Sequence, residues 1–204
     1  MSGLYQTITQ YGDLIRLDYK FASETYVNWT EENFDYVKYN PRKPIARYGL
    51  SLTSLDGGLS GVPDLDSLHE YNKENLTTYE EKDFNVFTPA YKNNESIQNF
   101  LKPFEGNFFR THVLKLDTGG FFPPHRDFRH TKLDSCRLIA PLKNPCTFIL
   151  EDKILDWRLG YLYFLNTAKV HQLFNTSLEP SYWLVVNLHV NEQTAETILT
   201  NLPQ

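Results

Sequence analysis

The sequence has little of several features that define whole classes of protein. Only two cysteines, Cys136 and Cys146, occur among 204 residues, which argues against a disulfide scaffold and against a zinc site held by cysteines. No apolar run approaches the roughly 20 residues of a membrane-spanning helix. The N-terminus also lacks the basic start and apolar run of a signal peptide. We therefore expect a cytoplasmic protein without a membrane partner.

An excess of basic residues is also missing. Lysine and arginine number 20 against 25 aspartates and glutamates, which gives a formal net charge of −5, and no basic block stands out. A nucleic-acid partner therefore has no electrostatic support. The apolar share of 41% is that of a folded chain and not of a disordered one.

Aromatic residues are abundant, and together with many Val, Leu and Thr runs they favour a sheet-rich fold. The first 105 residues are polar and rich in loops. They contain candidate strands at 14–21 and 45–54, and two candidate helices at 30–37 and 94–104. Thr30 and Asn94 precede or open these helices and are suitable N-caps.

From residue 108 onward the sequence reads as short strands separated by turns. The strands span residues 108–116, 135–142, 146–151, 160–166, 170–175 and 181–190. Closely spaced strands of this length favour an all-β sandwich or barrel, and a jelly roll is the leading candidate. The prediction is one mainly β domain over 1–204, a double-stranded β-helix (jelly roll, cupin-like) with a few flanking helices. Its parts are a loop- and helix-rich segment on the substrate side (1–105), a core carrying the metal site (106–191) and a tail (192–204).

The segment GGFFPPHRDFRH, residues 119–130, contains the most informative pattern. In an extended chain residues i and i+2 project to the same face, so His125 and Asp127 can converge on one point. His171 lies in a later strand that can turn back onto the first. Two imidazoles and one carboxylate form the facial triad of non-haem Fe(II) oxygenases, which leaves positions open for other ligands. A polar surface turn is the plain alternative for an isolated His-x-Asp pair.

Two other known motifs resemble parts of this region, but each lacks a residue or a second copy that the motif requires. His-Arg-Asp also occurs in the catalytic loop of protein kinases, but that motif needs an asparagine where this chain has Lys132. Asp117-Thr118-Gly119 resembles the aspartic-protease triplet. A second such triplet is missing, and a turn between strands explains these residues equally well.

Residues 108–190 resemble the 2-oxoglutarate-dependent Fe(II) oxygenases, specifically the aspartyl/asparaginyl β-hydroxylase-like branch, which includes proline hydroxylases. The matching segments are PPHRD, CRLIAPL and GYLYFLNTAKVHQLFNTS, in that order. The resemblance implies a jelly roll with Fe(II) on His125, Asp127 and His171. It also implies that 2-oxoglutarate and O2 are consumed while a Pro, Asp or Asn side chain, free or in a peptide, is hydroxylated. Related halogenases lack the carboxylate, so Asp127 favours hydroxylation.

The chain departs from this family where the far carboxylate of 2-oxoglutarate is bound. The family often places an arginine about ten residues beyond the distal histidine, where this chain has Ser181, and residues 172–204 contain no lysine or arginine. Arg137 is therefore the predicted carboxylate partner, since guanidinium pairs carboxylates bidentately. Lys143 and Arg126 are the reserve candidates. Ser181 and Asn166 are predicted to assist co-substrate binding.

Substrate residues are predicted in the first half and next to the motif. Arg47 and Tyr48 open the segment 47–68, a candidate substrate loop that reads equally well as a strand and a surface loop. His130 is a further candidate contact. His112 and His189 lie in apolar strands and are expected to be structural, although alternation could turn His112 inward. The alternative function is a non-catalytic, cupin-like metal- or ligand-binding protein. A metal-dependent isomerase is disfavoured because HxH-type clusters are absent.

Overall fold

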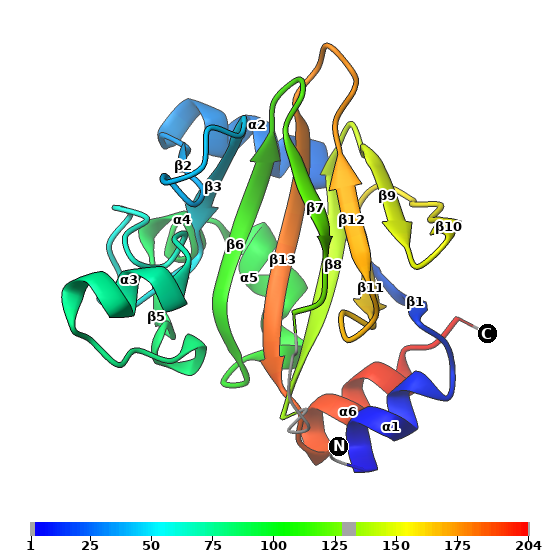
Figure 1. The fold of residues 1–204 in the computed structure, drawn as a ribbon. Coiled ribbons are helices and arrows are strands. Elements are labelled where there is room, and N and C mark those ends of the chain that lie inside the picture. Colours follow the sequence, from blue (N-terminus) through cyan, green and yellow to red (C-terminus); the bar gives the residue numbers. More distant parts are fainter. Residues whose placement is uncertain (1–2, 128–133, 204) are drawn as a thin grey trace.

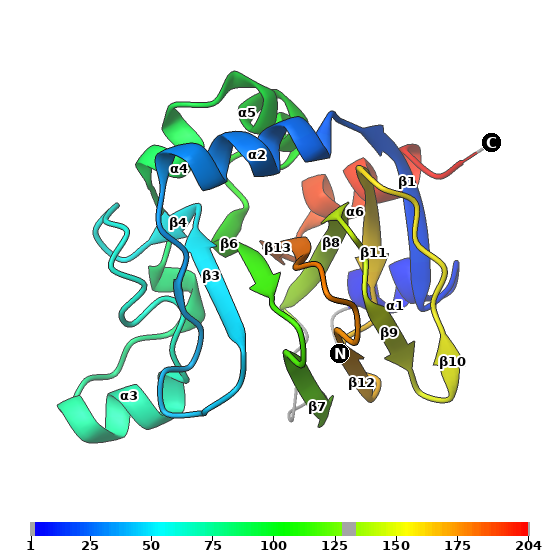
Figure 2. The same ribbon diagram turned by 90° about the horizontal axis from the view of Figure 1, so that it is seen from above.

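Two β-sheets face each other, and helices cover the outer side of the larger one (Figures 1 and 2). The structure is a computed structural model and describes residues 3–127 and 134–203. The smaller sheet lies on the opposite side of the large sheet from the main helices, as the view from above shows (Figure 2). This two-sheet arrangement confirms the predicted jelly roll with a few flanking helices.

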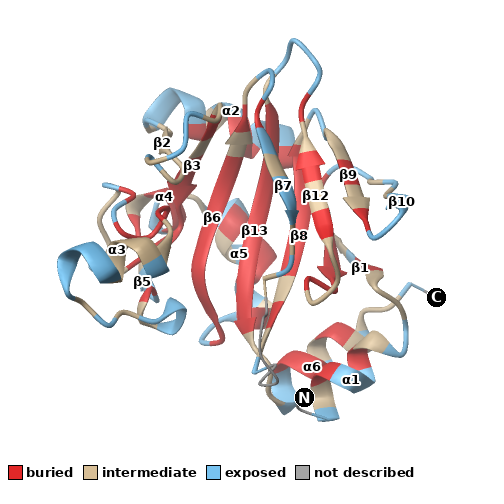
Figure 3. Cartoon of the chain, viewed as in Figure 1, coloured by how far each residue is buried: buried red, intermediate tan, exposed pale blue. Residues whose placement is uncertain are grey.

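The large sheet has the strand order β1-β11-β8-β13-β6-β3-β2. The strands are β1 (Leu14–Lys20), β2 (Val37–Lys38), β3 (Arg47–Ser51), β6 (Phe108–Leu116), β8 (Ser135–Lys143), β11 (Tyr161–Leu165) and β13 (Ser181–His189). Its central strands β6, β8 and β13 are buried along most of their length, because side chains on both faces are covered (Figure 3). Strands from the first 105 residues thus extend the same sheet at both edges.

The small sheet has the order β10-β9-β12-β7. Its strands are β7 (Phe121–His125), β9 (Thr147–Leu150), β10 (Lys153–Ile154) and β12 (His171–Phe174). Strand β7 lies at the edge, where the missing N–H groups of Pro123 and Pro124 are tolerated. A separate two-stranded sheet pairs β4 (Thr53–Ser54) with β5 (Val86–Phe87).

Six α-helices and two 3-10 turns complete the described chain. They are α1 (Gly3–Thr9), α2 (Ser23–Asn33), α3 (Leu68–Asn75), η1 (Glu81–Asp83), α4 (Pro89–Lys92), α5 (Glu95–Leu101), η2 (Lys102–Phe104) and α6 (Glu192–Thr200). The prediction of Asn94 as an N-cap is confirmed, since its side chain accepts a hydrogen bond from the Ile97 N–H. Helices α1 and α6 lie side by side at one end of the molecule (Figure 1).

The predicted helix at 30–37 is wrong. The helix α2 already begins at Ser23 because Tyr26, Val27 and Thr30 form its buried face. Thr30 is not an N-cap; its hydroxyl donates back to the Val27 carbonyl within the helix. The helix ends where Phe34 adopts extended backbone. None of the helices in the described part of the chain is long and apolar enough to cross a bilayer.

The apolar core has two parts, one on each side of the large sheet. The first lies between the helices and the sheet and includes Tyr26, Leu101 and Phe164. The second lies between the two sheets and includes Phe148, Leu173 and Trp183. The second core packs against β7 and β12 through Phe122 and Leu173, so it anchors the small sheet to the large one.

Candidate metal centre

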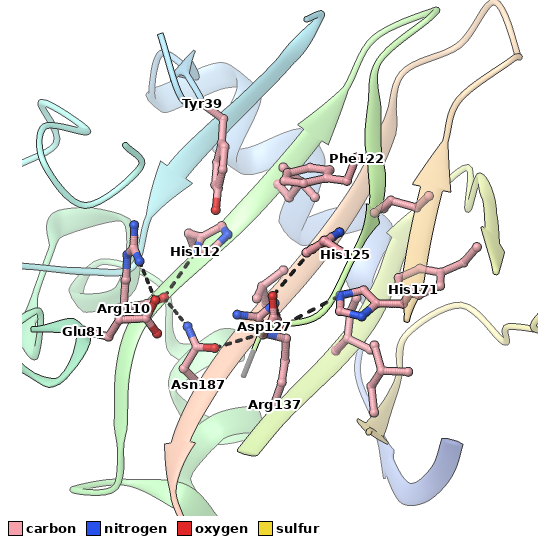
Figure 4. A pocket seen from close by; sticks show the side chains of 16 residues that line it. Tyr39, Glu81, Arg110, His112, Phe122, His125, Asp127, Arg137, His171 and Asn187 are labelled. Atoms are coloured by element: carbon pink, nitrogen blue, oxygen red, sulfur yellow. Dashed lines mark hydrogen bonds and ion pairs between the residues drawn. The ribbon is translucent and has the colours of Figure 1, made fainter. Parts of the chain in front are cut away.

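His125, Asp127 and His171 come together between the two sheets (Figure 4). His125 and His171 are direct partners across the antiparallel pair β7–β12. Asp127 lies two residues beyond β7, where its N–H donates to the Thr167 carbonyl at 3.1 Å. His125 Nε2 lies 3.5 Å from Asp127 Oδ1, and His171 Nε2 lies 3.8 Å from Asp127 Oδ2. The structure therefore brings the three predicted ligands to one point.

The glycine turn and the prolines before His125 fix its approach. A Cβ on Gly120 would lie 2.2 Å from the Ala46 carbonyl oxygen, so only glycine fits this close contact between the turn and the segment before β3. Pro123 presents its carbonyl oxygen to His125 Nδ1 at 2.7 Å. The stiff segment that precedes the His-x-Asp pair thus orients the imidazole itself.

Both histidines are held in the same tautomer. His171 Nδ1 lies 3.0 Å from the Lys169 carbonyl oxygen, and His125 Nδ1 faces the Pro123 carbonyl in the same way. A carbonyl only accepts hydrogen bonds, so each Nδ1 carries the proton. The lone pair of each Nε2 is then directed at the site, which is the arrangement of histidines that bind metals.

The electrostatics of Asp127 also suit a cation. Burial opposes its ionisation, but Arg137 and His171 outweigh burial and hold the carboxyl pKa below its usual range. Arg137 Nη1 lies 2.5 Å from Oδ2, yet no hydrogen bond of good geometry reaches this buried oxygen. Burial lowers the pKa of His171, which favours the neutral form that metals bind.

The donor atoms lie close enough together to share one ion. One ligand atom from each of the three residues lies within 4.8 Å of the other two. Bonds of about 2.1 Å that meet at right angles hold neighbouring ligand atoms about 3 Å apart, so the donors would draw together around an ion. Two nitrogens and one oxygen on one side of the ion leave the opposite side open to other ligands.

A cavity adjoins this open side. Its apolar walls come from both sheets and include Leu114, Ile139, Phe148 and Val185. Two aromatic side chains, Tyr39 and Phe122, line one end, as Figure 4 shows. Polar side chains gather at the other end; these are Glu81, Arg110, Arg137 and Asn187. The cavity thus combines an apolar body with a polar end in which two arginines face two carboxylates, a lining typical of small-molecule sites.

Arg137 has donors to spare. Its Nε donates to Asn187 Oδ1 at 3.0 Å and its Nη1 pairs with Asp127, while no described residue accepts a hydrogen bond from Nη2. Burial lowers the pKa of this guanidinium, but the neighbouring carboxylates of Asp127 and Glu81 more than compensate and keep it charged. Of the predicted carboxylate partners, Arg137 is the one that lies in the cavity.

Each nitrogen of Arg110, the second arginine of the cavity, already donates a hydrogen bond. Its three nitrogens donate to the Asp64 carbonyl, the Asp66 carbonyl and the Glu81 carboxylate at 3.0, 2.6 and 2.7 Å. It sits in a β-bulge of β6, with φ at +41°, where the register with β13 shifts. Arg110 therefore supplies charge and holds the 64–66 segment.

Other predicted site residues lie elsewhere. The Ser181 hydroxyl accepts hydrogen bonds from the Cys146 N–H and from Trp183 Nε1, outside the cavity. Lys143 Nζ donates to Asn28, and Arg126 is exposed. His130 falls outside the described residues.

The two predicted substrate residues on β3 point in opposite directions. Tyr48 lies under Lys38 Nζ, 4.7 Å from its ring centroid, in a groove apart from the metal centre. Arg47 is buried behind the aromatic end of the cavity, with its guanidinium 4.3 Å from the Phe122 ring centroid and 5.5 Å from that of Tyr39. Arg47 thus supports these two rings and does not itself line the cavity.

Asn166 supports the loop that carries the ligand partners. It accepts a hydrogen bond from the Tyr5 hydroxyl at 2.9 Å and donates to Asp13 Oδ1 at 2.8 Å. Asp13 in turn pairs with Lys169 at 2.6 Å. This loop supplies the Thr167 and Lys169 carbonyls, which hold Asp127 and His171. Asn166 therefore braces the loop that contacts Asp127 and His171, and it is not among the residues that line the cavity.

We expect Asn166→Ala to weaken metal binding about 10- to 100-fold, the usual cost of losing an outer partner of a metal ligand. Titration of the purified protein with Fe(II) without oxygen measures this. Asn33→Ala removes a comparable side-chain bond at the end of α2 and should leave metal affinity unchanged. Equal affinities for the two variants would show that the Asn166 contacts do not position the ligands.

His112 is also part of the cavity, which alternation along its strand allowed but did not decide. It is 5% exposed, and burial together with Arg110 and Arg137 lowers its pKa to about 3, against the opposing effect of the Arg110 carbonyl. The folded protein therefore keeps this imidazole neutral, while the unfolded chain protonates it below its ordinary pKa of about 6.5.

Acid should consequently destabilise the fold through His112. Above about pH 6.5 the imidazole is neutral in both states, and it does not reduce the free energy of unfolding. As the pH falls from 6.5 toward 3, the free energy of unfolding decreases, because only the unfolded chain binds a proton at His112. The loss between pH 7 and pH 5 is about 2 kcal/mol. We expect urea unfolding at pH 7 and at pH 5 to show that the free energy of unfolding falls by about 2 kcal/mol less in His112→Gln than in the unaltered protein. An unchanged pH dependence in the variant would contradict the assignment.

Several cavity residues were not anticipated from the sequence: Tyr39, Glu81, Arg110, Phe122 and Asn187. One of them carries a signal that could have been used. Asn187 is a polar residue inside the apolar strand SYWLVVNLHV, and a buried amide in such a place needs partners. The others are scattered over the edge strand β7, the turn η1, the bulge of β6 and the segment after β2, which share no periodic pattern.

Comparison with known proteins gives likenesses of fold at low identity. No protein-family model and no curated protein matches the chain. A Pseudomonas putida prolyl-4-hydroxylase is 12% identical, with 92% of this chain and 99% of that chain covered, at a TM-score of 0.49. A predicted oxalate decarboxylase from Thermotoga maritima is 17% identical over 44% of this chain and 73% of its own, at 0.34. The Schizosaccharomyces pombe Cnp3 cupin domain is 10% identical over 49% and 66%, at 0.35. Any functional conclusion therefore has to come from the geometry of the site.

Proposed function

We propose that this protein is an Fe(II)- and 2-oxoglutarate-dependent dioxygenase that hydroxylates an amino-acid side chain. The observation that carries the proposal is the convergence of two Nε2 lone pairs and one carboxylate beside a cavity with a free guanidinium edge. In the overall reaction one oxygen atom of O2 enters the substrate C–H bond. The other enters succinate, as 2-oxoglutarate loses CO2.

The ion would be held by His125, Asp127 and His171. Bound Fe(II) supplies a redox-active centre with open positions for O2 and a chelating keto acid. The protein's part is to fix both imidazole tautomers through the Pro123 and Lys169 carbonyls and to keep Asp127 ionised. Apolar walls from both sheets limit the access of water to this side of the ion.

The charge balance of the cavity favours a dianionic ligand. Its two arginines and its two carboxylates offset one another, and the metal-bound histidines are neutral. A divalent cation then leaves two positive charges in excess, which 2-oxoglutarate neutralises. Arg137 is the residue that offers unused donors to the far carboxylate, whereas every nitrogen of Arg110 is already engaged.

The test is an anaerobic titration of the metal-free protein with Fe(II) and then 2-oxoglutarate. A keto acid chelated to Fe(II) gives a weak visible charge-transfer band, which we expect to appear with one equivalent of each. Zn(II) in place of Fe(II) should give no band, because Zn(II) has a filled d shell and is not oxidised to a higher state. Iron binding without a band at saturating keto acid would contradict the proposal and favour a non-catalytic, cupin-like metal- or ligand-binding protein.

A further inference from the structure

His112 presents a bare acceptor atom to the cavity. Its Nδ1 lies 3.2 Å from the Arg110 carbonyl oxygen, so Nδ1 carries the proton and Nε2 the lone pair. The bulge frees this carbonyl from the ladder, and Asn187 Nδ2 donates to the same oxygen at 3.0 Å. Figure 4 shows the His112 ring between this bond and Tyr39. The backbone thus sets the tautomer of His112.

Apart from the candidate metal ligands, the acidic and amide side chains of the cavity have partners on the chain. Glu81 pairs with Arg110, Asp127 pairs with Arg137, and the Asn187 side-chain oxygen accepts from Arg137. No described residue donates a hydrogen bond to His112 Nε2. His112 lines the cavity, so a ligand that brings a donor can bond to this nitrogen in place of water. The cavity is therefore complementary to a hydrogen-bond donor at this point.

The location of this acceptor relates it to the metal centre. The rings of His112, Tyr39, Phe122 and His125 form a continuous wall, with successive centroids 5.5, 5.4 and 6.0 Å apart. A ligand group on this wall reaches from the acceptor toward the ion. The anionic co-substrate is directed to Arg137, and the lone pair of His112 repels carboxylates. The group at His112 therefore belongs to the second organic ligand, the substrate.

We infer that His112 is a specificity-determining residue whose Nε2 accepts a hydrogen bond from a substrate N–H group. The site accordingly takes a carboxamide at this position and rejects the isosteric carboxylate, which has no N–H to offer. This inference rests on the proposed function, since it assigns the substrate of the same site. Sites that hydrogen-bond a substrate group reject analogues lacking it strongly, because the buried partner is left unpaired.

The experiment uses the full chain labelled with 15N in its histidines. Zn(II) replaces Fe(II), so that 2-oxoglutarate is bound but no turnover occurs. The probes are the N-acetyl methylamides of L-asparagine and L-aspartate, and the readout is the 15N resonance of His112 Nε2. We expect the asparagine probe to move this resonance and to bind about 100-fold more tightly than the aspartate probe. Binding of aspartate with equal affinity, or a resonance that neither probe moves, overturns the inference.

Two variants of His112 test whether the preference for the asparagine probe depends on the acceptor atom or on the shape of the ring. His112→Phe keeps a ring and should reduce the preference to within about threefold, whereas His112→Gln keeps an acceptor and should retain most of it. His189→Phe makes the same change elsewhere in the large sheet and should leave the preference intact. A preference that survives in His112→Phe also overturns the inference. The charge-transfer band tests the keto acid separately, so a missing band with a responsive His112 resonance would contradict only the proposed oxygenase chemistry.

Discussion

His171→Ala is expected to abolish the charge-transfer band and to weaken Fe(II) binding by more than about 100-fold, beyond the cost of losing an outer partner. His171 is 3% exposed, opens β12 and faces His125 across the strand pair. Besides His125 and Asp127, no other His, Cys, Asp or Glu of the described residues belongs to this cluster, so no further side chain of these types stands ready to replace His171. Anaerobic titration with Fe(II), followed by 2-oxoglutarate, measures both losses.

The control for this prediction must show that the fold survives. His171 also contacts Phe148 and the second core, so His171→Ala could loosen the small sheet. His171→Gln keeps more of the volume but lacks the imidazole lone pair, and it should lose the band as well. Urea unfolding of both variants reports on the fold. Retention of full metal affinity by two folded variants would remove His171 from the ligand set.

The convergence of His125 and Asp127 could be predicted from the sequence because their geometry is local. Alternation in a strand brings residues 125 and 127 to one face, and a later apolar strand is the natural place for a third ligand. The structure adds that β7 and β12 are direct neighbours, so that His125 and His171 meet in register. The two-sheet fold followed from the same alternation and from the spacing of the turns.

Which residues surround the candidate ligands depends on how neighbouring strands are aligned. This strand register cannot be predicted from a short stretch of sequence. Ser181 was chosen by its distance along the chain from His171, but it begins β13 opposite Leu116. Asn187 lies beside Arg137, six residues or about 20 Å farther along the same strand. The length of the turn before β13 decides which of the two reaches the cavity. Asn166 likewise lies near His171 in sequence, yet its side chain faces α1 and β1.

The helix α2 illustrates a different limit. Thr30 followed by two glutamates resembles a helix start, and local propensity alone could not place the helix seven residues earlier. The buried face of Tyr26, Val27 and Thr30 against the large sheet decides the outcome. Tertiary packing outweighs the capping preference here because capping contributes only about 1 kcal/mol.

Arg137→Ala should raise the 2-oxoglutarate concentration at half-maximal band intensity about 30- to 150-fold. The change removes a charge-assisted contact worth about 2–3 kcal/mol in a site shielded from water. Arg137→Lys keeps the charge but not the planar fork that pairs with a carboxylate, so an intermediate loss is expected. Because Arg137 also pairs with Asp127, Fe(II) affinity has to be measured first, without the keto acid.

Arg126→Ala supplies the matched control, since Arg126 stands beside the same motif but is exposed. Arg126→Ala should leave the 2-oxoglutarate concentration at half-maximal band intensity unchanged. If Arg126→Ala raises this concentration and Arg137→Ala does not, the carboxylate is bound from the other side of the motif and Arg137 serves Asp127 alone. An increase confined to the Arg137 variants, at unaltered iron affinity, is the result expected if Arg137 on β8 binds the far carboxylate of 2-oxoglutarate.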